Sequence, residues 1–484
     1  MDRSALAKAL ARAVPGLEVI AEPEALRPFE SDGLTALRQL PLIAVLPTAV
    51  DQVQAVLRYC HREGIPVVAR GAGTGLSGGA LPHEAGVLLV LSKLSKILEI
   101  NPTRQTARLQ PGVRNLAISE AAAPYGLFYA PDPSSQIACS IGGNVAENAG
   151  GVHCLKYGLT VHNLLAVTIV TVEGELLTLG GPTLDAPGLD LLALFTGSEG
   201  LLGVVVEVTV RLRPIPAQQE VLLAAFDSIR ASGDAVAAVI AAGIIPAGME
   251  LMDKLAVQAA EDFVHAGYPR DAAAVLLCEL DGEGPVLEAT RARVMAVLRE
   301  AGAVSITVSD SEAMRLKLWS GRKNAFPAVG RLAPDYYCMD GTIPRRYLGE
   351  VLDAIAQRSE AAGLPVANVF HAGDGNLHPL ILYDANAPDG VARAEALGNE
   401  ILALCVAYGG SVTGEHGVGV EKLDAMCGQF EAPELTRFKA LKAAFDPQGL
   451  LNPGKAVPTL ARCAELGGMH VHHGQLPHPE LPRL

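Results

Sequence analysis

Apolar residues in the first part of the chain form short continuous runs and one helical repeat. Residues 41–47 (PLIAVLP) form an apolar run between prolines, and residues 67–69 form another. Between them, Val53, Val56 and Leu57 recur at helical spacing within residues 49–63. Runs of this length predict buried strands, and the helical spacing predicts a helix. Residues 1–40, with Leu6, Leu10 and Val14 in helical register, are expected to be a helical segment.

The pattern changes after residues 211–216 (RLRPIP), whose prolines mark a domain boundary. Strand-like runs at 221–226, 274–280 and 304–308 then alternate with helical stretches, which predicts a helix-covered antiparallel sheet. The predicted class is α+β. The predicted units are 1–40, 41–216, 217–415, 416–457 and a histidine-containing tail at 458–484.

Charge and composition exclude several classes of function. The 484 residues carry a net charge of −14 with acids and bases interspersed, which argues against a nucleic-acid partner. The apolar stretch 235–249 contains Gly243 and Pro246 and is too short for a membrane span. No signal segment is visible, so a cytoplasmic location is expected.

The eight cysteines are scattered without a C-x-x-C pair. This spacing indicates neither a disulfide framework nor a zinc knuckle nor an iron–sulfur site. We therefore expect reduced, mostly buried thiols.

Three segments rich in small residues suggest a cofactor site. Residues 70–79 (RGAGTGLSGG) can form a backbone nest for phosphate, and residues 131–151 and 196–203 follow with glycines and amides. Gly73, Gly75 and Gly78 fit G-x-G-x-x-G, but the strand-like residues 86–90 follow instead of the helix of a Rossmann fold. Each segment alone is compatible with a tight turn. The series favours a large planar cofactor lying against the backbone.

A second group of residues suggests a metal. His371 and His378 flank a glycine turn in FHAGDGNLH (370–378), and Glu415 and His416 lie in TGEHG (413–417). Imidazole and carboxylate ligands can hold a divalent ion while leaving positions open for catalysis. This pattern by itself leaves a metal-dependent hydrolase as an alternative.

The order of the three glycine segments resembles the FAD-binding family of vanillyl-alcohol oxidase and p-cresol methylhydroxylase. The resemblance covers essentially the whole chain, and it is strongest to FAD-linked subunits of bacterial glycolate oxidases, relatives of D-lactate and D-2-hydroxyglutarate dehydrogenases. It implies a two-part FAD-binding α/β domain, a cap domain, and a return of residues 416–457 to the FAD domain. The implied FAD-binding residues are Arg70, Gly71, Ala72, Gly73, Thr74, Gly75, Leu76, Ser77, Pro131, Asp132, Ser134, Ser135, Gly142, Gly143, Asn144, Asn148, Glu199, Leu202, Gly203, Val205 and Asn452, with Lys455 nearby.

The resemblance also implies the chemistry. Glu415 would join His371 and His378 as the third ligand of Zn, Mn or Fe, and Arg322 would bind the substrate carboxylate. We hypothesise that His416 takes the hydroxyl proton while hydride passes to FAD. Phe326 and Cys338 stand where relatives acting on dicarboxylates carry a hydroxyl and a lysine, which argues for a small 2-hydroxy monocarboxylate such as glycolate or D-lactate.

Some alternatives and partners remain to be tested. His153 stands where distant members attach FAD covalently, but a polar or core role is expected. Electrons would pass to a second FAD-binding subunit and an iron–sulfur subunit, then to quinone, placing the chain at the inner membrane through its partners. A D-lactate dehydrogenase acting alone and an assembly subunit without turnover are the alternatives. The tail histidines 470, 472, 473 and 478 are expected to serve docking rather than metal binding.

Overall fold

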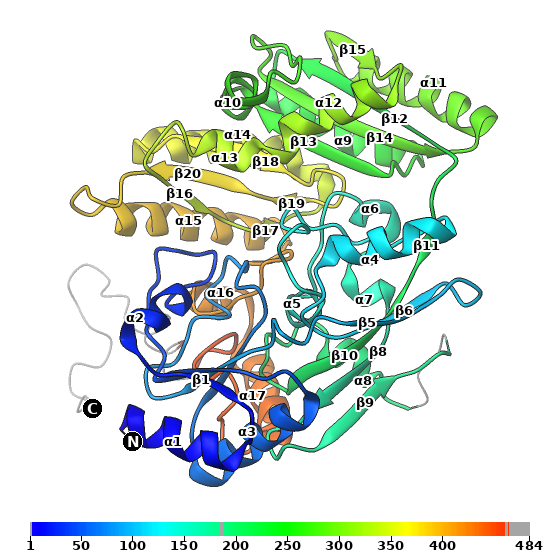
Figure 1. Ribbon diagram of the computed structural model, residues 1–484. Helices are drawn as coiled ribbons and strands as arrows, with labels where there is room; N and C mark the ends of the chain where they lie inside the picture. The colour runs from blue at the N-terminus through cyan, green and yellow to red at the C-terminus, as the bar shows by residue number, and fades with distance from the viewer. Residues whose placement is uncertain (1, 184–187, 460–462, 464–484) are drawn as a thin grey trace.

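The computed structural model describes residues 2–183, 188–459 and 463, and Figure 1 shows them in two parts. The N-terminal part runs from α1 (Arg3–Ala13) to β11 (Arg213–Pro214), and the cap runs from β12 (Gln218–Phe226) to α15 (Gly390–Ala407). Helices and strands are mixed in both, so the predicted α+β class is confirmed. Apart from residues 458, 459 and 463, the predicted tail and its histidines lie outside the described residues.

The N-terminal part begins with a four-stranded sheet in the order β1 (Glu18–Ile20), β2 (Ile43–Leu46), β4 (Val87–Val90), β3 (Val67–Arg70). β2 and β3 both run parallel to β4, and the apolar face of α3 (Val50–Glu63) packs against them. The predicted order of strand, helix, strand and glycine loop is confirmed. The helical expectation for residues 1–40 is wrong at β1, because its three residues pair antiparallel with β2.

A five-stranded antiparallel sheet forms the other half of this part. Its order is β5 (Ile97–Asn101), β6 (Thr106–Leu109), β10 (Val204–Arg211), β8 (Leu164–Val170), β9 (Leu176–Gly180). The short α5 (Ile141–Glu147) packs on the valine-rich β10. Other short elements lie between the strands of the two sheets: α2 (Pro23–Leu26), α4 (Asn115–Ala122), β7 (Leu127–Phe128), α6 (Cys154–Tyr157), α7 (Thr160–Asn163) and α8 (Leu191–Phe195).

The cap is built on a seven-stranded sheet, which confirms the predicted helix-covered antiparallel sheet. Its order is β15 (Ser305–Val308), β12, β14 (Ala274–Gly282), β13 (Gly248–Asp253), β18 (Val366–Phe370), β20 (Pro379–Tyr383), β16 (Asp335–Cys338). β13 lies in the middle and was not predicted as a strand. A small two-stranded sheet, β17 (Gly341–Thr342) with β19 (Asn376–Leu377), lies beside it.

Residue alternation along the cap strands separates two faces. Leu222, Ala224 and Phe226 of β12 face the core shared with α9 (Ile229–Ala241), α11 (Gly284–Glu300) and α14 (Leu348–Ala362). Val221, Leu223 and Ala225 face α10 (Lys254–Val264), α12 (Glu312–Lys323) and α13 (Ala325–Val329). We call this second face the α12 face, after the helix that packs on it. It also carries the polar residues of the candidate site.

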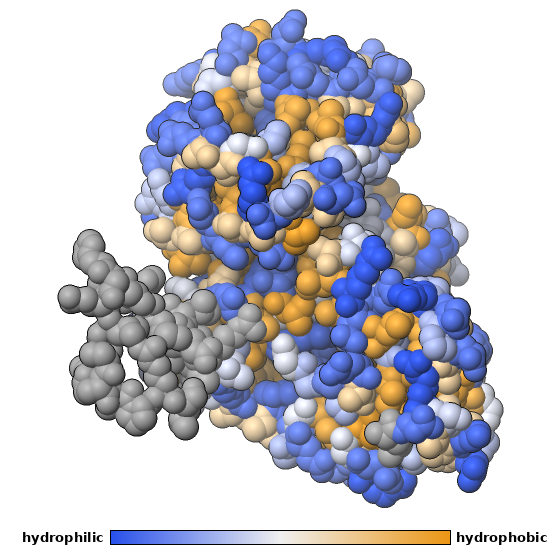
Figure 2. All heavy atoms as spheres, turned by 90° about the vertical axis from the view of Figure 1, so that its left-hand side faces the viewer, coloured by the Kyte–Doolittle hydropathy of each residue, from blue (hydrophilic) through white to orange (hydrophobic). Residues whose placement is uncertain are grey.

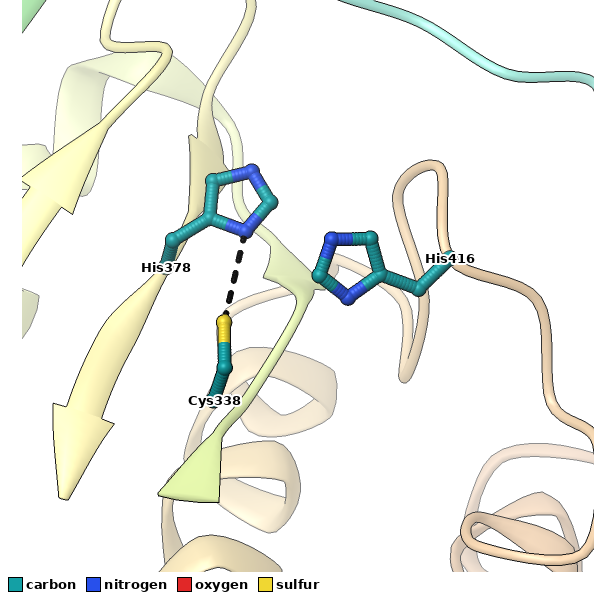
Figure 3. A group of neighbouring side chains, drawn as sticks. All are labelled: Cys338, His378 and His416. Carbon is teal, nitrogen blue, oxygen red and sulfur yellow. Dashed lines mark hydrogen bonds between the residues drawn. The ribbon is translucent and has the colours of Figure 1, made fainter. Parts of the chain in front are cut away.

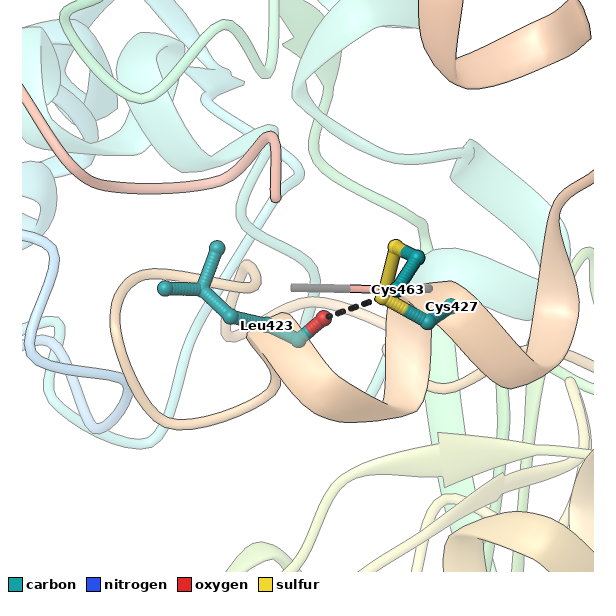
Figure 4. The surroundings of a disulfide bond; sticks show 3 residues. All are labelled: Leu423, Cys427 and Cys463. Atoms are coloured by element: carbon teal, nitrogen blue, oxygen red, sulfur yellow. Dashed lines mark hydrogen bonds between the residues drawn. A yellow bond between two sulfur atoms is a disulfide. The ribbon is translucent and has the colours of Figure 1, made fainter. Parts of the chain in front are cut away.

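The end of the chain returns to the N-terminal part. After α16 (Leu423–Gln429) and α17 (Ala432–Phe445), Leu451 forms a bridge with Val67 at the start of β3. Cys427 on α16 forms a disulfide with Cys463, and its sulfur lies 3.7 Å from the carbonyl oxygen of Leu423 (Figure 4). The expectation of reduced thiols is therefore wrong for this pair, because the fold brings together two cysteines 36 residues apart. The other six cysteines are free and buried.

Polar and apolar residues are interspersed on the face shown in Figure 2. Among the described residues, no helix combines the length and apolar composition needed to cross a membrane.

Candidate active site

A cavity of about 390 Å³ lies between the N-terminal part and the cap. One wall comes from the N-terminal part and is made mainly of backbone and small side chains. The opposite wall comes from the cap and the loop after it, and it carries ionisable side chains. We call the first the backbone wall; it includes Arg70–Leu76, Ser134, Ser135, Gly142, Gly143, Asn144, Glu199, Gly203 and Val205. We call the second the side-chain wall; it includes Arg322, His371, His378, Glu415 and His416.

Two glycines of the backbone wall lie too close to neighbouring side chains to carry one of their own. A Cβ atom on Gly71 would lie 2.2 Å from Ser140 Oγ, and one on Gly73 would lie 2.1 Å from Arg70 Nη2. Gly73 also has a φ of +72°, which disfavours other residues. Two buried atoms near this wall, Ser140 Oγ and Glu147 Oε2, have no hydrogen-bond partner among the described residues. Such a cradle with unpaired polar atoms fits a bound cofactor.

Six of the residues implied for FAD binding do not line the cavity. Two of them make contacts next to the backbone wall: the Ser77 carbonyl accepts from Val420 N, and Asn452 Nδ2 donates to the carbonyls of Gly79 and Glu199. Lys455 Nζ also donates to the Gly79 carbonyl at 2.9 Å, and burial lowers the pKa of this amine to about 7. The six are Ser77, Pro131, Asp132, Asn148, Leu202 and Asn452.

His371 and His378 converge on Glu415 because both lie on the α12 face of the cap sheet. His371 follows β18 and His378 precedes β20, and each continues the alternation of its strand. Their Nε2 atoms lie 3.2 Å and 3.1 Å from Glu415 Oε1. Burial opposes ionisation of Glu415, but the two imidazoles outweigh it, so the pKa of Glu415 lies well below its ordinary value. Two imidazole nitrogens and one carboxylate converging at a cavity form a donor set that suits a divalent metal.

Glu250, which the sequence did not single out, supports both His371 and Arg322. Leu251 pairs with Phe370 across β13 and β18, so Glu250 and His371 lie side by side. Glu250 Oε1 lies 2.9 Å from His371 Nδ1, and Glu250 Oε2 lies 2.7 Å from Arg322 Nε. A carboxylate behind a histidine fixes the ring and leaves the other nitrogen free to act as a ligand.

His378 has a second set of neighbours, shown in Figure 3. Its Nδ1 lies 3.9 Å from Cys338 Sγ on β16, and the rings of His378 and His416 are 4.9 Å apart. Potential ligand atoms of Cys338, His378 and His416 lie within 4.8 Å of one another. Burial raises the pKa of the Cys338 thiol well above its usual value. In the other set, both imidazoles lie within 3.2 Å of the Glu415 carboxylate, whereas Cys338 Sγ lies 3.9 Å from His378 Nδ1.

His416 lies on a loop, residues 413–422, that we call the His416 loop. Burial is the main reason that the pKa of His416 falls to about 4, so its imidazole is neutral at pH 7. Its Nδ1 is buried and has no hydrogen-bond partner among the described residues. A neutral imidazole with an unengaged nitrogen at a cavity can accept a proton.

Asp340 holds the first half of the His416 loop. It accepts from the Thr413 hydroxyl at 2.7 Å, from His416 N at 2.9 Å and from Lys422 Nζ at 3.1 Å. Asp340 and Lys422 are both fully buried. Burial opposes ionisation of Asp340, but the Lys422 ammonium outweighs it and holds the pKa of Asp340 well below its usual range. No sequence motif pointed to this pair, because Asp340 lies 82 residues before Lys422.

Glu199 holds the second half of the same loop from the N-terminal part. Its carboxylate accepts from Val418 N and Gly419 N, each at 2.7 Å. Glu199 has a φ of +51°, an uncommon conformation outside glycine that suggests a position fixed by its surroundings. The His416 loop is therefore fixed by one carboxylate from the cap and one from the N-terminal part.

Arg322 lies near the end of α12 and is 2% exposed. Beyond its ion pair with Glu250, its Nη2 has no hydrogen-bond partner among the described residues. A buried guanidinium with unpaired N–H groups at a cavity is suited to a carboxylate. His153, in contrast, does not line the cavity, and its two ring nitrogens lie 2.7 Å from Asp132 Oδ2 and 3.1 Å from Glu279 Oε1.

The chain matches two protein-family models. Residues 41–180 match a model described as FAD binding domain, and residues 215–456 match one described as FAD linked oxidases, C-terminal domain. A relative, the glycolate oxidase subunit GlcD of Escherichia coli strain K12, is 63% identical over all of this chain and 97% of its own length. A D-lactate dehydrogenase of Anaerostipes hadrus is 31% identical over 86% of this chain and 89% of its own length.

A solved structure of p-cresol methylhydroxylase with bound substrate superposes with a TM-score of 0.79. It covers 95% of this chain and 98% of its own, at 19% identity. At this identity the likeness shows the shared fold alone.

Proposed function

Because this chain belongs to the family of FAD-linked oxidases, we propose that it oxidises a small 2-hydroxy monocarboxylate, glycolate or D-lactate, to the 2-oxo acid. The observation that carries the proposal is a single cavity with two walls. The wall formed by the FAD-binding domain is shaped for a cofactor, and the wall opposite it presents Arg322, His371, His378, Glu415 and His416. A hydrolase would need no such cradle.

A flavin cofactor and a metal ion would complete the site. FAD, held by the backbone wall, supplies a hydride acceptor for the substrate C2. His371, His378 and Glu415 would hold a divalent metal, Zn, Mn or Fe, which supplies Lewis acidity toward the substrate hydroxyl. The convergent donor atoms and the carboxylate of Glu250 behind His371 support this assignment.

The residues of this chain would act as follows. Arg322 would bind the substrate carboxylate through its unpaired Nη2, with Glu250 fixing the guanidinium from the other side. This contact would orient C2 toward the backbone wall. His416 would take the hydroxyl proton, since its imidazole is neutral at pH 7.

Preference for a small monocarboxylate would come from Phe326 and Cys338. Phe326 lines the cavity and contacts the His378 ring edge-on, with centroids 6.3 Å apart. Cys338, whose Sγ lies 3.9 Å from His378 Nδ1, carries a neutral thiol because burial raises its pKa. Neither side chain offers a cation for a second carboxylate, so a dicarboxylate would leave a charge unpaired.

Anaerobic titration tests the proposal. Purified, FAD-loaded protein is mixed with glycolate, D-lactate or L-lactate, and the flavin absorbance is followed. We expect bleaching by glycolate or D-lactate. Absence of bleaching with all three would overturn the substrate class. Bleaching by D-lactate alone would favour the second candidate, a D-lactate dehydrogenase, which the A. hadrus relative supports.

A metal-removal experiment tests the ligand assignment. Removal of the metal by a chelator, verified by metal analysis, should lower the rate of flavin bleaching by substrate. The absorbance spectrum of the oxidised flavin should persist. His378→Ala should show the same loss and no longer bind one equivalent of metal. Full activity of metal-free protein would overturn this assignment.

We also propose that the reduced chain passes electrons to a second FAD-binding subunit and an iron–sulfur subunit, and thence to quinone at the inner membrane. Relatives described as subunits of glycolate oxidase support a multi-subunit enzyme. Co-purification from native cells, followed by flavin and iron analysis of the captured chains, tests the partners. Capture of the chain alone, with full quinone reductase activity, would contradict them.

A further inference from the structure

A second buried carboxylate of the cap, Glu279, has no role in the mechanism above. Across β13 and β14, Gly248 pairs with Glu279 and Glu250 pairs with Leu277. Because alternate residues of a strand share a face, Glu250 and Glu279 both project from the α12 face. Glu250 holds Arg322 at the end of α12. Glu279 holds the same helix one turn earlier.

Glu279 makes contacts with two residues of α12. Trp319 Nε1 donates to Glu279 Oε2, and Arg315 Nη1 donates to the same oxygen at 3.1 Å. The Glu279 side chain is fully buried, so these contacts are shielded from water. Trp319 and Arg322 are three residues apart and therefore lie on the same side of the helix. A shift of Trp319 would move the Arg322 guanidinium with it.

The other oxygen of Glu279 is bound by the N-terminal part. His153 Nε2 lies 3.1 Å from Glu279 Oε1, and His153 Nδ1 lies 2.7 Å from Asp132 Oδ2. Burial disfavours the imidazolium, but the two carboxylates outweigh it, so the pKa of His153 is raised well above its usual value. Asp132 belongs to the segment implied to lie beside FAD. The contacts thus run from the cofactor side of the molecule to the helix that carries Arg322.

The backbone packs closely at this contact. A Cβ atom on Gly248 would lie 2.9 Å from both Cγ1 and the carbonyl oxygen of Val152, and one on Gly373 would lie 2.7 Å from Leu155 Cδ2. The segment around His153 is therefore seated against the α12 face near the candidate site. His153 has little freedom to move away from Glu279.

We propose that His153 is a positioning residue for Arg322. Through Glu279 and Trp319, it fixes α12 relative to the FAD-binding domain and so sets the distance between the guanidinium and the cofactor wall. The inference rests on the proposed role of Arg322 in binding the substrate carboxylate. It assigns to His153 a part in substrate positioning rather than direct contact with substrate or flavin.

Replacing His153 by Gln tests the proposal. Gln retains hydrogen-bonding groups but no positive charge, so the link between Asp132 and Glu279 is weakened. In FAD-loaded protein with an artificial electron acceptor, we expect the KM for glycolate to rise about tenfold, because a misplaced clamp weakens carboxylate binding. We expect kcat to change by less than about threefold, because His416 and its loop are untouched.

Lys156→Met is the matched control. Lys156 pairs with Asp281, also across the boundary between the two parts, but within the described part of the chain Asp281 has no hydrogen bond or ion pair with α12. This variant should leave KM unchanged. An equal rise of KM in both variants would mean that general docking of the two parts matters, and the proposal would be overturned.

Trp319 is the only tryptophan of the chain and provides a readout that does not depend on turnover. His153→Gln should shift its fluorescence emission, whereas Lys156→Met should not. The shift can be measured even if no 2-hydroxy acid bleaches the wild-type flavin, which separates failure of the network from failure of the proposed function. An unchanged emission spectrum and an unchanged KM would each overturn the proposal.

Trp319→Phe is the alternative test variant if the His153→Gln protein does not retain FAD. It removes the N–H donor to Glu279 while keeping an aromatic ring in the core. We expect a KM rise of about threefold, with kcat retained. A KM equal to that of the wild type would then refute the role of the network.

Discussion

The two walls of the cavity are built on different physical principles. The backbone wall depends on shape, since an added methyl group at Gly71 or Gly73 has no room. The side-chain wall depends on buried carboxylates, since Glu250 holds Arg322 and His371, and Asp340 holds the His416 loop together with Lys422. Variants of the backbone wall should therefore lose FAD binding or folding stability, whereas variants of the side-chain wall should lose turnover or leave a buried charge unpaired.

The strongest test of this difference is His416→Asn. Removing the proton acceptor from the side-chain wall should lower the rate of anaerobic flavin bleaching by roughly 10² to 10⁴-fold, the usual contribution of general base catalysis. FAD content, measured by absorbance, should stay the same because the backbone wall is intact.

His265→Asn is the control for His416→Asn. His265 is exposed and has a φ of +52°, which asparagine tolerates. Its bleaching rate should match the wild type. A His416 variant whose flavin is bleached at the wild-type rate would contradict the role of the side-chain wall in turnover.

The buried pair behind the His416 loop gives the next largest effect. Lys422→Met leaves the buried Asp340 carboxylate without its cation, which should cost about 3–5 kcal/mol in the free energy of unfolding. Urea unfolding of the variant measures this loss. The double variant Asp340→Asn/Lys422→Met should recover part of it, because the unpaired Asp340 charge is then removed as well.

An exposed ion pair is the control that tests whether burial causes the loss of stability expected for Lys422→Met. Arg270 and Asp262 pair at 2.7 Å on the surface, and Arg270→Ala should leave the urea midpoint unchanged. A Lys422→Met protein as stable as the wild type would contradict the dependence of the side-chain wall on charge pairing.

Two glycine variants sharpen the description of the backbone wall. Gly71→Ala should destabilise even the FAD-free protein by about 1–3 kcal/mol, since the clash is with Ser140. Gly75→Ala should not, because its Cβ would meet only Asp32 Oδ2, at 4.0 Å. If FAD lies on this loop, Gly75→Ala should instead weaken FAD binding. Thermal melts with and without FAD distinguish the two effects.

The smallest expected effect concerns specificity. Phe326→Thr adds a hydroxyl to the cavity without a cation, so the ratio of kcat/KM for glycolate over a 2-hydroxy dicarboxylate should fall by about tenfold or less. Adding Cys338→Lys should lower the ratio further. A ratio that rises in the double variant would contradict the role given to these two positions.

Much of the fold could be predicted from local pattern. The strands β2, β3, β4, β10 and β14 are short apolar runs between glycines or prolines, and the helix α3 has a clear apolar face. β13 escaped prediction because both of its faces are buried, so its residues show no alternation and merge with the apolar stretch before it. β1 is only three residues long and takes its conformation from pairing with β2. The Cys427–Cys463 disulfide depends on the return of the chain past α16.

Local sequence was enough to identify the residue types of both walls: glycine loops for close backbone approach, and His371, His378, Glu415 and His416 for the chemistry. Those signals are local, because a turn or a motif needs only neighbouring residues. Which charged residues support them became visible only in the folded chain. Glu250, Glu279, Asp340 and Lys422 show no motif, because their roles depend on strand register and on loops that meet from distant parts of the chain. Burial then makes each unpaired charge costly, so these pairings fix the geometry of the site.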